Sequence, residues 1–348
     1  MKNLTLIFVF ILIAVQTNAT VRTLSGGGGG QYSDFNAAYN ASSNGDTIMI
    51  QPYSGSYYAV AMDKSLVYIG VGFNATKMNS YRSVIQPANL CCGWRLMYTS
   101  ASGSRFYGLE FSSGFQLSSE NGQVSNVVFE DCKFASTITI GGNNGNGYGH
   151  ANITFRNCIF EQDDGVNMTL DPVNSGITNG VFLTNCIFEG RIQTGSIGYV
   201  PTNVLIDHCL FLSSVTPIFN LTNLTIQNSI FMNCTSIQNF SPNNYVNNFA
   251  RLVSMSSPNI GLTDPQFVNY SLGSFYSASH NYNVTNPAAL TGATDGTQVG
   301  VNGGASSFNE SGETLIIPIV RSMTINNTTV PPGGTIQVKV KATKPNGN

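Results

Sequence analysis

A short phrase that recurs five times between Val127 and Phe231 constrains the fold more than any other feature of the sequence. The copies are VVFEDCKF, ITFRNCIF, VFLTNCIF, VLIDHCLF and LTIQNSIF. Successive copies are 26, 28, 23 and 20 residues apart, measured between their small residues Cys132, Cys158, Cys186, Cys209 and Ser229. Self-similarity at this period indicates a solenoid, because propeller blades need about 40 residues or more.

Within each phrase apolar residues alternate with variable ones, and a period of two is typical of a β-strand. Lys133 and Ile159 share one variable slot, so we expect that slot to face outward. One such strand-rich phrase per repeat predicts a parallel β-helix whose coils stack at about 4.8 Å. The cysteines would then form a buried column of small residues, beside an interior stack of Phe134, Phe160, Phe188, Phe211 and Phe231.

A second column precedes the small residues and holds Asp131, Asn157, Asn185, His208 and Asn228. We expect these side chains to lie at a turn, where they hydrogen-bond along the stack and to free backbone groups. This structural role also accounts for His208. Neither His150 nor His280 combines with a serine or cysteine nucleophile in a catalytic motif, so the histidines predict no active site.

The composition restricts the class of protein. Only 9% of the 348 residues are charged, the formal net charge is −2, and 42% are hydrophobic. This hydrophobic content excludes a disordered chain, and the absence of a basic run gives no reason to expect nucleic acid as a partner. A turn-rich solenoid with an uncharged polar surface fits these values, and we expect it to be a monomer.

Residues 1–19 have the pattern of a secretory signal peptide, with Lys2 before an apolar run from Leu4 to Val15 and a small residue, Ala19, for cleavage. The run is too short to span a bilayer comfortably. The mature protein is therefore expected to be secreted, extracellular or at the cell surface, and not membrane-spanning.

An amphipathic helix is predicted directly after the entry segment. Ser33 can cap it, and Phe35, Ala38 and Tyr39 fall on one face. Such a helix would form an N-terminal cap over the first coil, whose bare strand edge would otherwise pair with other chains.

The opening segments GDTIMIQPYSGSY and KSLVYIGVG resemble the first coils of pectin lyase-like proteins, and the repeat phrases resemble the coils of the same superfamily. The segments TDPQFVN and QVGVNGG resemble closing coils of secreted members of the Bacteroidetes type. The resemblance implies an all-β fold, a single-stranded right-handed parallel β-helix over residues 20–305. Residues 306–348 are predicted to form a linker and a short β tail, with strands at 322–326 and 335–341 around a turn at Pro331–Gly334.

The superfamily contains hydrolases of pectic polysaccharides, and three fragments resemble parts of their motif: Gln162–Gly165, Gly149–His150 and Gly190–Ile192. The paired aspartates precede the Gly-His element in those hydrolases, whereas His150 here comes first. Asp163 and Asp164 are also adjacent, so on a strand they would face opposite ways. The fragments therefore assign no catalytic residue.

The lyases of the superfamily use calcium-binding carboxylates and a basic residue that abstracts a proton. Asp163, Asp164 and Asp171 could supply some of the 6–8 oxygen ligands that calcium requires, with Arg156 or Arg191 as the nearest candidate base. The acids are few and scattered, so a solvated polar loop is the preferred interpretation. No metal or cofactor is expected, and zinc is disfavoured because no Cys or His pair has the required spacing.

The cysteines are expected to be free, buried thiols, because stacked neighbours in a column point the same way and have poor disulfide geometry. For function we expect a non-catalytic carbohydrate-binding or adhesion role, with a polysaccharide or a cell-surface glycan as partner. The alternative is a polysaccharide lyase or glycoside hydrolase that acts on an acidic, pectin-like chain. An enzyme would gather acids and bases from adjacent coils in one cleft, whereas a binding protein would expose aromatic and amide side chains.

Overall fold

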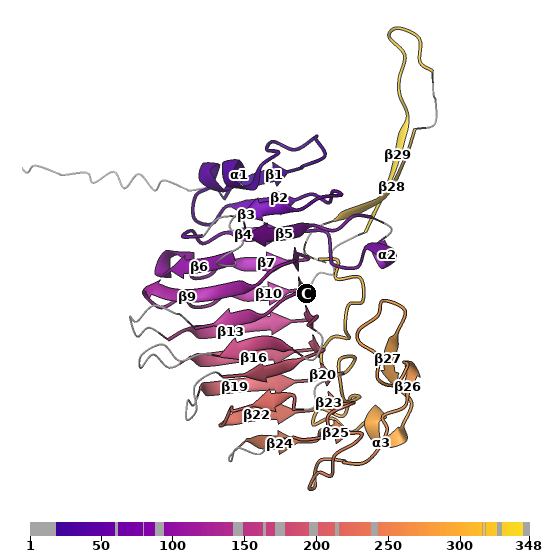
Figure 1. Cartoon of the computed structure of the whole chain (residues 1–348). Helices are drawn as coiled ribbons and strands as arrows, with labels where there is room; N and C mark the ends of the chain where they lie inside the picture. Colours follow the sequence, from indigo (N-terminus) through magenta and orange to yellow (C-terminus); the bar gives the residue numbers. More distant parts are fainter. Residues whose placement is uncertain are drawn as a thin grey trace, which may run out of the picture.

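The chain winds into a parallel β-solenoid of about seven turns (Figure 1). The structure is a computed structural model that describes residues 19–59, 62–78, 80–87, 94–141, 149–162, 165–170, 178–194, 201–212, 216–237, 243–314, 316, 318–325 and 329–343. The predicted all-β fold, a right-handed parallel β-helix, is confirmed. The predicted signal peptide lies outside the described residues except for Ala19.

Three parallel sheets form the walls of the solenoid within the described residues. Sheet A contains β1 (Val21–Leu24), β2 (Thr47–Ile50), β4 (Val67–Ile69), β7 (Arg105–Tyr107), β10 (Val128–Glu130), β13 (Ala151–Arg156), β16 (Asn179–Thr184), β19 (Thr202–Asp207), β22 (Leu224–Gln227) and β24 (Asn244–Val246). Sheet B contains β3 (Tyr57–Ala59), β5 (Val84–Pro87), β8 (Glu110–Phe111), β11 (Lys133–Phe134), β14 (Ile159–Phe160), β17 (Ile187–Phe188), β20 (Leu210–Phe211), β23 (Ile230–Phe231) and β25 (Phe249–Ala250). Sheet C contains β6 (Trp94–Tyr98), β9 (Phe115–Asn121), β12 (Ile138–Ile140), β15 (Val166–Leu170), β18 (Arg191–Gln193) and β21 (Ile218–Phe219).

The repeated phenylalanines form the interior stack that the sequence predicts. Phe134, Phe160 and Phe188 lie in register on successive strands of sheet B. Their ring centroids are 5.0 and 4.5 Å apart, and the ring planes are tilted by at most 11°. The stack continues to Phe211 and Phe231 at 5.0 and 4.9 Å. This spacing is that of the strands themselves, so the backbone ladder and the aromatic contacts reinforce each other.

The cysteine column lies beside this stack and is fully buried. Cys132, Cys158, Cys186 and Cys209 are 0% exposed and free. Each thiol lies 3.3 Å from the carbonyl oxygen of the residue two positions earlier, as in Cys158 Sγ to Arg156 O. The expected role of these thiols as small buried hydrophobic groups is confirmed, whereas Cys91 and Cys92 lie outside the described residues.

The helix α1 (Phe35–Ala41) covers the first coil, as expected. Phe35, Ala38 and Tyr39 are buried, and the Phe35 ring stacks on Tyr68 inside the solenoid at 6.1 Å. The predicted N-cap is wrong by one residue. Asp34, not Ser33, caps the helix, because its carboxylate accepts a hydrogen bond of 2.9 Å from the Ala37 amide.

The polar column lies at the turn between sheets A and B, in the left-handed backbone conformation. The five residues have φ angles between 48° and 57°. Asn and Asp enter this region at lower cost than most residues with a Cβ atom, and His is also enriched there. The predicted turn is therefore confirmed. The backbone angle is a further reason why the small polar residues recur, beside the hydrogen bonds that the sequence suggests.

The sequence predicts a β-helix that extends to residue 305, whereas the stacked parallel strands of the described residues end at β24 and β25. The chain then forms an antiparallel pair, β26 (Phe267–Asn269) with β27 (Asn281–Val284), and a short helix, α3 (Pro287–Leu290). Residues 292–314, which we call the strap, run back along the polar column from the last coil toward the first (Figure 1). Phe308 and Thr314 are buried, so the packed chain extends past the predicted boundary at residue 305.

The C-terminal strands β28 (Ile319–Ile325) and β29 (Val338–Thr343) form an antiparallel hairpin. It projects away from the solenoid near the N-terminal coils (Figure 1). The predicted β tail is present, with strand bounds shifted by one to three residues. Within the predicted turn, the Gly334 amide donates a 2.8 Å hydrogen bond to the carbonyl of Pro331.

Candidate functional site

The strap binds the polar column through side chains that hydrogen-bond its backbone. Asn185 is 2% exposed, and its Nδ2 donates to the carbonyls of Val301 and Gly303 at 2.8 and 2.9 Å. Asn157 accepts from the amide of Asn309 at 2.7 Å. The column therefore links the coils to a segment more than a hundred residues away.

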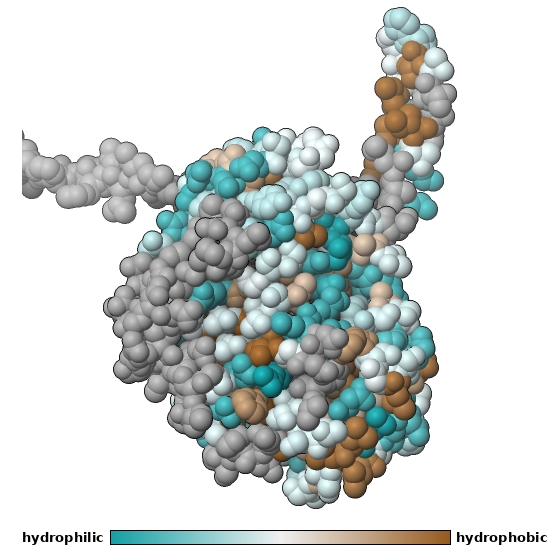
Figure 2. Space-filling model, in the orientation of Figure 1, coloured by the Kyte–Doolittle hydropathy of each residue, from teal (hydrophilic) through white to brown (hydrophobic). Residues whose placement is uncertain are grey.

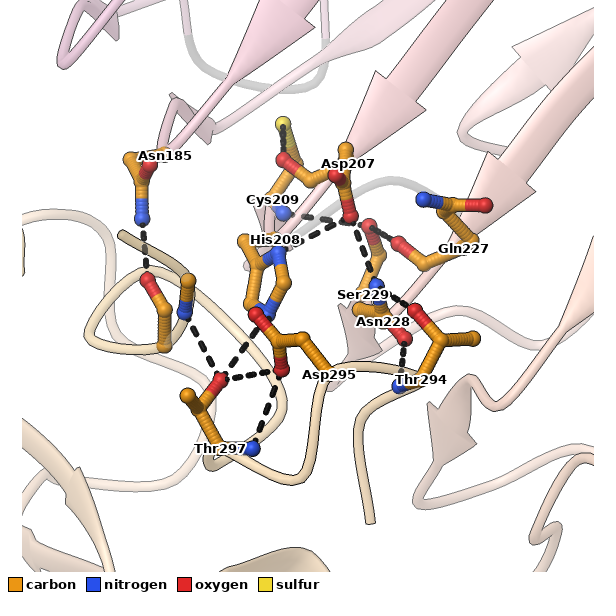
Figure 3. Close-up of polar contacts among 12 residues, drawn as sticks. Asn185, Asp207, His208, Cys209, Gln227, Asn228, Ser229, Thr294, Asp295 and Thr297 are labelled. Carbon is orange, nitrogen blue, oxygen red and sulfur yellow. Dashed lines mark hydrogen bonds and ion pairs between the residues drawn. The ribbon is translucent and has the colours of Figure 1, made fainter. Parts of the chain in front are cut away.

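His208 holds the strap through a chain of polar contacts shown in Figure 3. Its Nδ1 lies 2.9 Å from an Asp207 carboxylate oxygen, and its Nε2 lies 3.3 Å from the Thr297 hydroxyl. The same hydroxyl donates to Asp295 at 2.7 Å and accepts from the Gly304 amide at 2.8 Å. Hydrogen bonds from His208 and Asn228 keep the Asp207 pKa below its ordinary value, although burial, the largest single influence, acts in the opposite direction.

The order of carboxylate, imidazole and hydroxyl in this network is that of a hydrolytic triad. His208 is only 2% exposed, however, and it is not among the lining residues of the two cavities described below. The Thr297 hydroxyl also has three partners apart from the imidazole, namely Asp295, the Gln298 carbonyl and the Gly304 amide. We therefore assign the network a structural role as a clasp for the strap.

The fragments that resemble the hydrolase motif do not form a site in the described part of the chain. His150 is 0% exposed, and burial lowers its pKa to about 4, so the ring is neutral at physiological pH. Ile192 is buried, and Gln193 is partly exposed. Arg191 lies 5.1 Å from the Phe219 ring centroid. Asp163 and Asp164 lie outside the described residues.

The two basic residues considered for a lyase mechanism belong to different sheets. Arg156 is on β13 of sheet A, where it pairs with Glu130 at 3.3 Å, whereas Arg191 is on β18 of sheet C. Asp171 lies outside the described residues. Among the residues that the structure describes, no group of three or more His, Cys, Asp or Glu side chains is arranged to hold a metal ion.

The remaining histidine, His280, is hydrogen-bonded to the Tyr282 hydroxyl at 3.1 Å.

A row of alternating charges lies instead on the outer face of sheet B. Glu110 on β8 and Lys133 on β11 are register partners, and both point away from the aromatic interior. Arg82, just before β5, pairs closely with Glu110. Glu161, just after β14, pairs with Lys133 at 2.7 Å. These four residues, which we call the charged row, lie in or next to four successive strands of sheet B: Arg82, Glu110, Lys133 and Glu161.

Partial burial shapes the electrostatics of the charged row. The side chains of Glu110 and Lys133 are 8% and 13% exposed, whereas Arg82 and Glu161 are 36% and 29% exposed. Burial raises the pKa of Glu110, and the positive charges of Lys133 and Arg82 oppose this effect. Two cations and two carboxylates leave the row without net charge.

Two neighbouring cavities open along the charged row. One has a volume of about 270 Å³ and is lined by Phe73, Asn74, Ala75, Thr76, Arg82, Lys133, Glu161, Tyr276, Ser277 and Ala278. The other has a volume of about 340 Å³ and is lined by Tyr53, Ser54, Gly55, Ser56, Ala75, Tyr81, Arg82, Val84, Glu110 and Ser112. They share Ala75 and Arg82, so together they form one groove, which we call the charged groove.

The wall of the charged groove is fixed by the helix α2 (Ala75–Met78) and by the strap. Asn74 caps the α2 turn, because its side-chain oxygen accepts from the Lys77 amide at 3.1 Å, and its Nδ2 donates to Glu310 O at 2.9 Å. Lys77 pairs with the Glu310 carboxylate at 2.8 Å. Tyr276 also lines the groove, and its amide donates to the Glu189 carboxylate at 2.6 Å. The groove is therefore built on anchored backbone.

The sequence does contain a signal for this site, in the slot between the small residue and the phenylalanine. An earlier and looser copy of the phrase, SRFYGLEF at residues 104–111, has Glu110 in this slot. The next copy has Lys133, and the later copies have Ile159, Ile187, Leu210 and Ile230. All of these point outward as predicted, but the last four are buried beneath the returning chain, against Tyr282, Val284 and Val299. The copies with Glu110 and Lys133 in this slot are the ones that line the charged groove, beyond the segment that the returning chain covers.

Comparison of the chain with protein-family models, with curated proteins and with solved structures gave no match in any of the three searches. Within the described residues, no helix has the length and apolar character that crossing a bilayer requires. The class defined by the fold is thus a parallel β-solenoid.

Proposed function

We propose that the protein is a secreted, non-catalytic carbohydrate-binding β-solenoid and that the charged groove holds the glycan. The observation that carries this proposal is the groove itself, where tyrosines and paired charges line about 600 Å³ of cavity on the outer face of sheet B. Concave sites with a few placed polar groups are typical of small-molecule and oligomer binding. The predicted signal peptide supports a location outside the cell.

The chemistry of the charged groove suits a hydroxyl-rich ligand. Sugar hydroxyls can accept from Arg82 and Lys133 and donate to Glu110 and Glu161, and hydrogen bonds to charged groups are the stronger ones. Tyr81 is 62% exposed and offers an aromatic face beside the row. Because the row has no net charge, a neutral polysaccharide is favoured over a polyanion. The resemblance of the repeats to pectin lyase-like proteins agrees with a glycan ligand.

The test is binding of the purified chain to a panel of soluble polysaccharides, neutral and acidic, by affinity electrophoresis and calorimetry. Tyr81→Ser and Glu161→Gln should each weaken binding about tenfold, because each removes a group from the groove without altering the interior. Tyr98→Ser is the matched control, since Tyr98 is exposed on sheet C. Unchanged binding in both groove variants, or no binding to any glycan, would exclude the proposed site.

A second candidate, a glycoside hydrolase, is favoured by one observation. Charged residues from adjacent coils gather in one groove, and they include two carboxylates, Glu110 and Glu161, of which the first has a raised pKa because of burial. Hydrolases need such a pair, with one carboxyl protonated. Incubation with the same panel should release new reducing ends, and Glu110→Gln and Glu161→Gln should abolish them. Binding without any products would exclude this candidate.

A further inference from the structure

Within the described residues, the hairpin β28–β29 adds no strand to the sheets of the solenoid and no residue to the lining of the charged groove. Its strands form a separate two-stranded sheet, and both outer strand edges are free of other strands in the described part of the chain. Every residue from Pro331 to Ala342 is exposed. A two-stranded hairpin is at best marginally stable by itself, so contact of one of its faces with another surface would stabilise it.

The two faces of the hairpin differ in chemistry. Ile325 and Val338 are register partners and therefore share a face, and Val340 follows two residues later on the same face. These three side chains are 49–52% exposed, and Figure 2 shows hydrophobic surface along the projecting hairpin. Lys339 and Lys341 alternate with the valines and face the other way. The hairpin is thus an exposed amphipathic element with a cationic face.

Its charge is opposite to that of the rest of the chain. From Thr314 to the C-terminus the sequence has four cations and no acid: Arg321, Lys339, Lys341 and Lys344. Residues 1–313 contain the other 11 cations and all 17 acids. Two such hairpins would repel each other, and edge lysines oppose strand pairing between copies. An anionic surface is the complementary partner.

Among anionic partners, a lipid bilayer best matches an element that has one apolar face and one cationic face. Amphipathic elements of this kind lie in the headgroup region, with the apolar side chains toward the acyl chains and lysines reaching the anionic headgroups. An acidic polysaccharide would leave the valines uncovered. A protein partner would need about 800 Å² on each side, more than three half-exposed side chains provide.

We propose that the β28–β29 hairpin binds the surface of anionic lipid bilayers, with Ile325, Val338 and Val340 turned toward the acyl chains. The hairpin lies in the plane of the headgroups and does not enter the hydrocarbon, because its unpaired strand edges require water. The solenoid and the charged groove then remain in solution beside the membrane. This inference does not depend on the ligand of the groove.

The experiment is sedimentation of the full chain with vesicles of phosphatidylcholine containing about 30% phosphatidylglycerol, compared with pure phosphatidylcholine. We expect binding to the anionic vesicles that weakens as salt rises. Each lysine near the surface contributes about fivefold in affinity, so Lys339→Gln with Lys341→Gln should reduce binding about 25-fold. Val338→Thr with Val340→Thr should also weaken it while retaining strand propensity.

The matched control for the apolar variant is Val268→Thr with Leu272→Thr, because these side chains are 56% and 59% exposed on another part of the chain. This control should bind as the unaltered protein does. Equal binding to neutral and anionic vesicles would overturn the proposal, as would full binding by the lysine variant. Complete competition by soluble polyglutamate would indicate an acidic protein partner instead of lipid.

Discussion

Asp131 is the one acidic member of the polar column, and its replacement by asparagine should stabilise the protein at neutral pH. The carboxyl is 7% exposed, and burial raises its pKa to about 7 although Asn157 and Asn309 donate hydrogen bonds to it. For an acid with a raised pKa, the stabilising contribution is complete below the ordinary value near 3.8. That contribution is lost as the pH rises through the folded-state pKa.

The magnitude follows from the two pKa values. A difference of about three units corresponds to about 4 kcal/mol of folding free energy at 1.36 kcal/mol per unit. An asparagine side chain at this position would have nearly the same shape, would tolerate the φ angle of 55° and would still accept from both amides. Asp131→Asn should therefore match the unaltered protein near pH 4 and exceed its free energy of unfolding by up to about 4 kcal/mol at pH 8.

Thermal unfolding of both proteins at pH 4, 6 and 8 measures this effect. For a chain of this size 1 kcal/mol corresponds to about 2 °C in Tm, so a gap of up to about 8 °C should open between pH 4 and pH 8. Asp264→Asn controls for the loss of one negative charge at a less buried position. A gap that stays constant with pH, or a less stable variant at pH 8, would refute the reasoning.

Three further predictions concern the strap and the interior. Asn185→Ala leaves two strap carbonyls without a hydrogen-bond donor, so it should lower the free energy of unfolding by about 2–4 kcal/mol. The strap should also become susceptible to limited proteolysis, and unchanged cleavage would contradict this role. The pKa values of Asp207 and Asp295 are lowered, so the stability that these carboxylates contribute is present above about pH 3.8 and is lost as the pH falls below it. Amide hydrogen exchange in the strap should therefore accelerate at low pH. Exchange rates that do not depend on pH, after correction for the intrinsic rate, would contradict the role of the clasp. Phe160→Ala should cost about 3–5 kcal/mol in unfolding free energy, because the ring is stacked on both sides, and a cost below about 1 kcal/mol would show that the stack is not continuous.

The sequence by itself determined the solenoid, because each coil repeats the same short pattern of residues. The period of two sets the strand, the phenylalanine sets the interior face, and Asn, Asp or His at the turn tolerates the left-handed backbone angle. Each of these preferences is encoded within about eight residues, so a repeated phrase reveals all of them. The sharing of one slot by Lys133 and Ile159 indicates only that this slot faces outward, and it does not predict that a returning segment covers Ile159.

Only the tertiary structure decided which segment supplies that cover and where the charges meet. The strap pairs with the polar column across as many as 178 residues, from Asn309 to Asp131. The charged row similarly joins residues that are neighbours only because the coils stack. Such contacts depend on the path of the returning chain. That path is set by the shape and polarity of the outer surface that the stacked coils present. The repeat places Glu110 and Lys133 side by side, but no periodicity along the sequence predicts the segments that complete the charged groove and the clasp at His208.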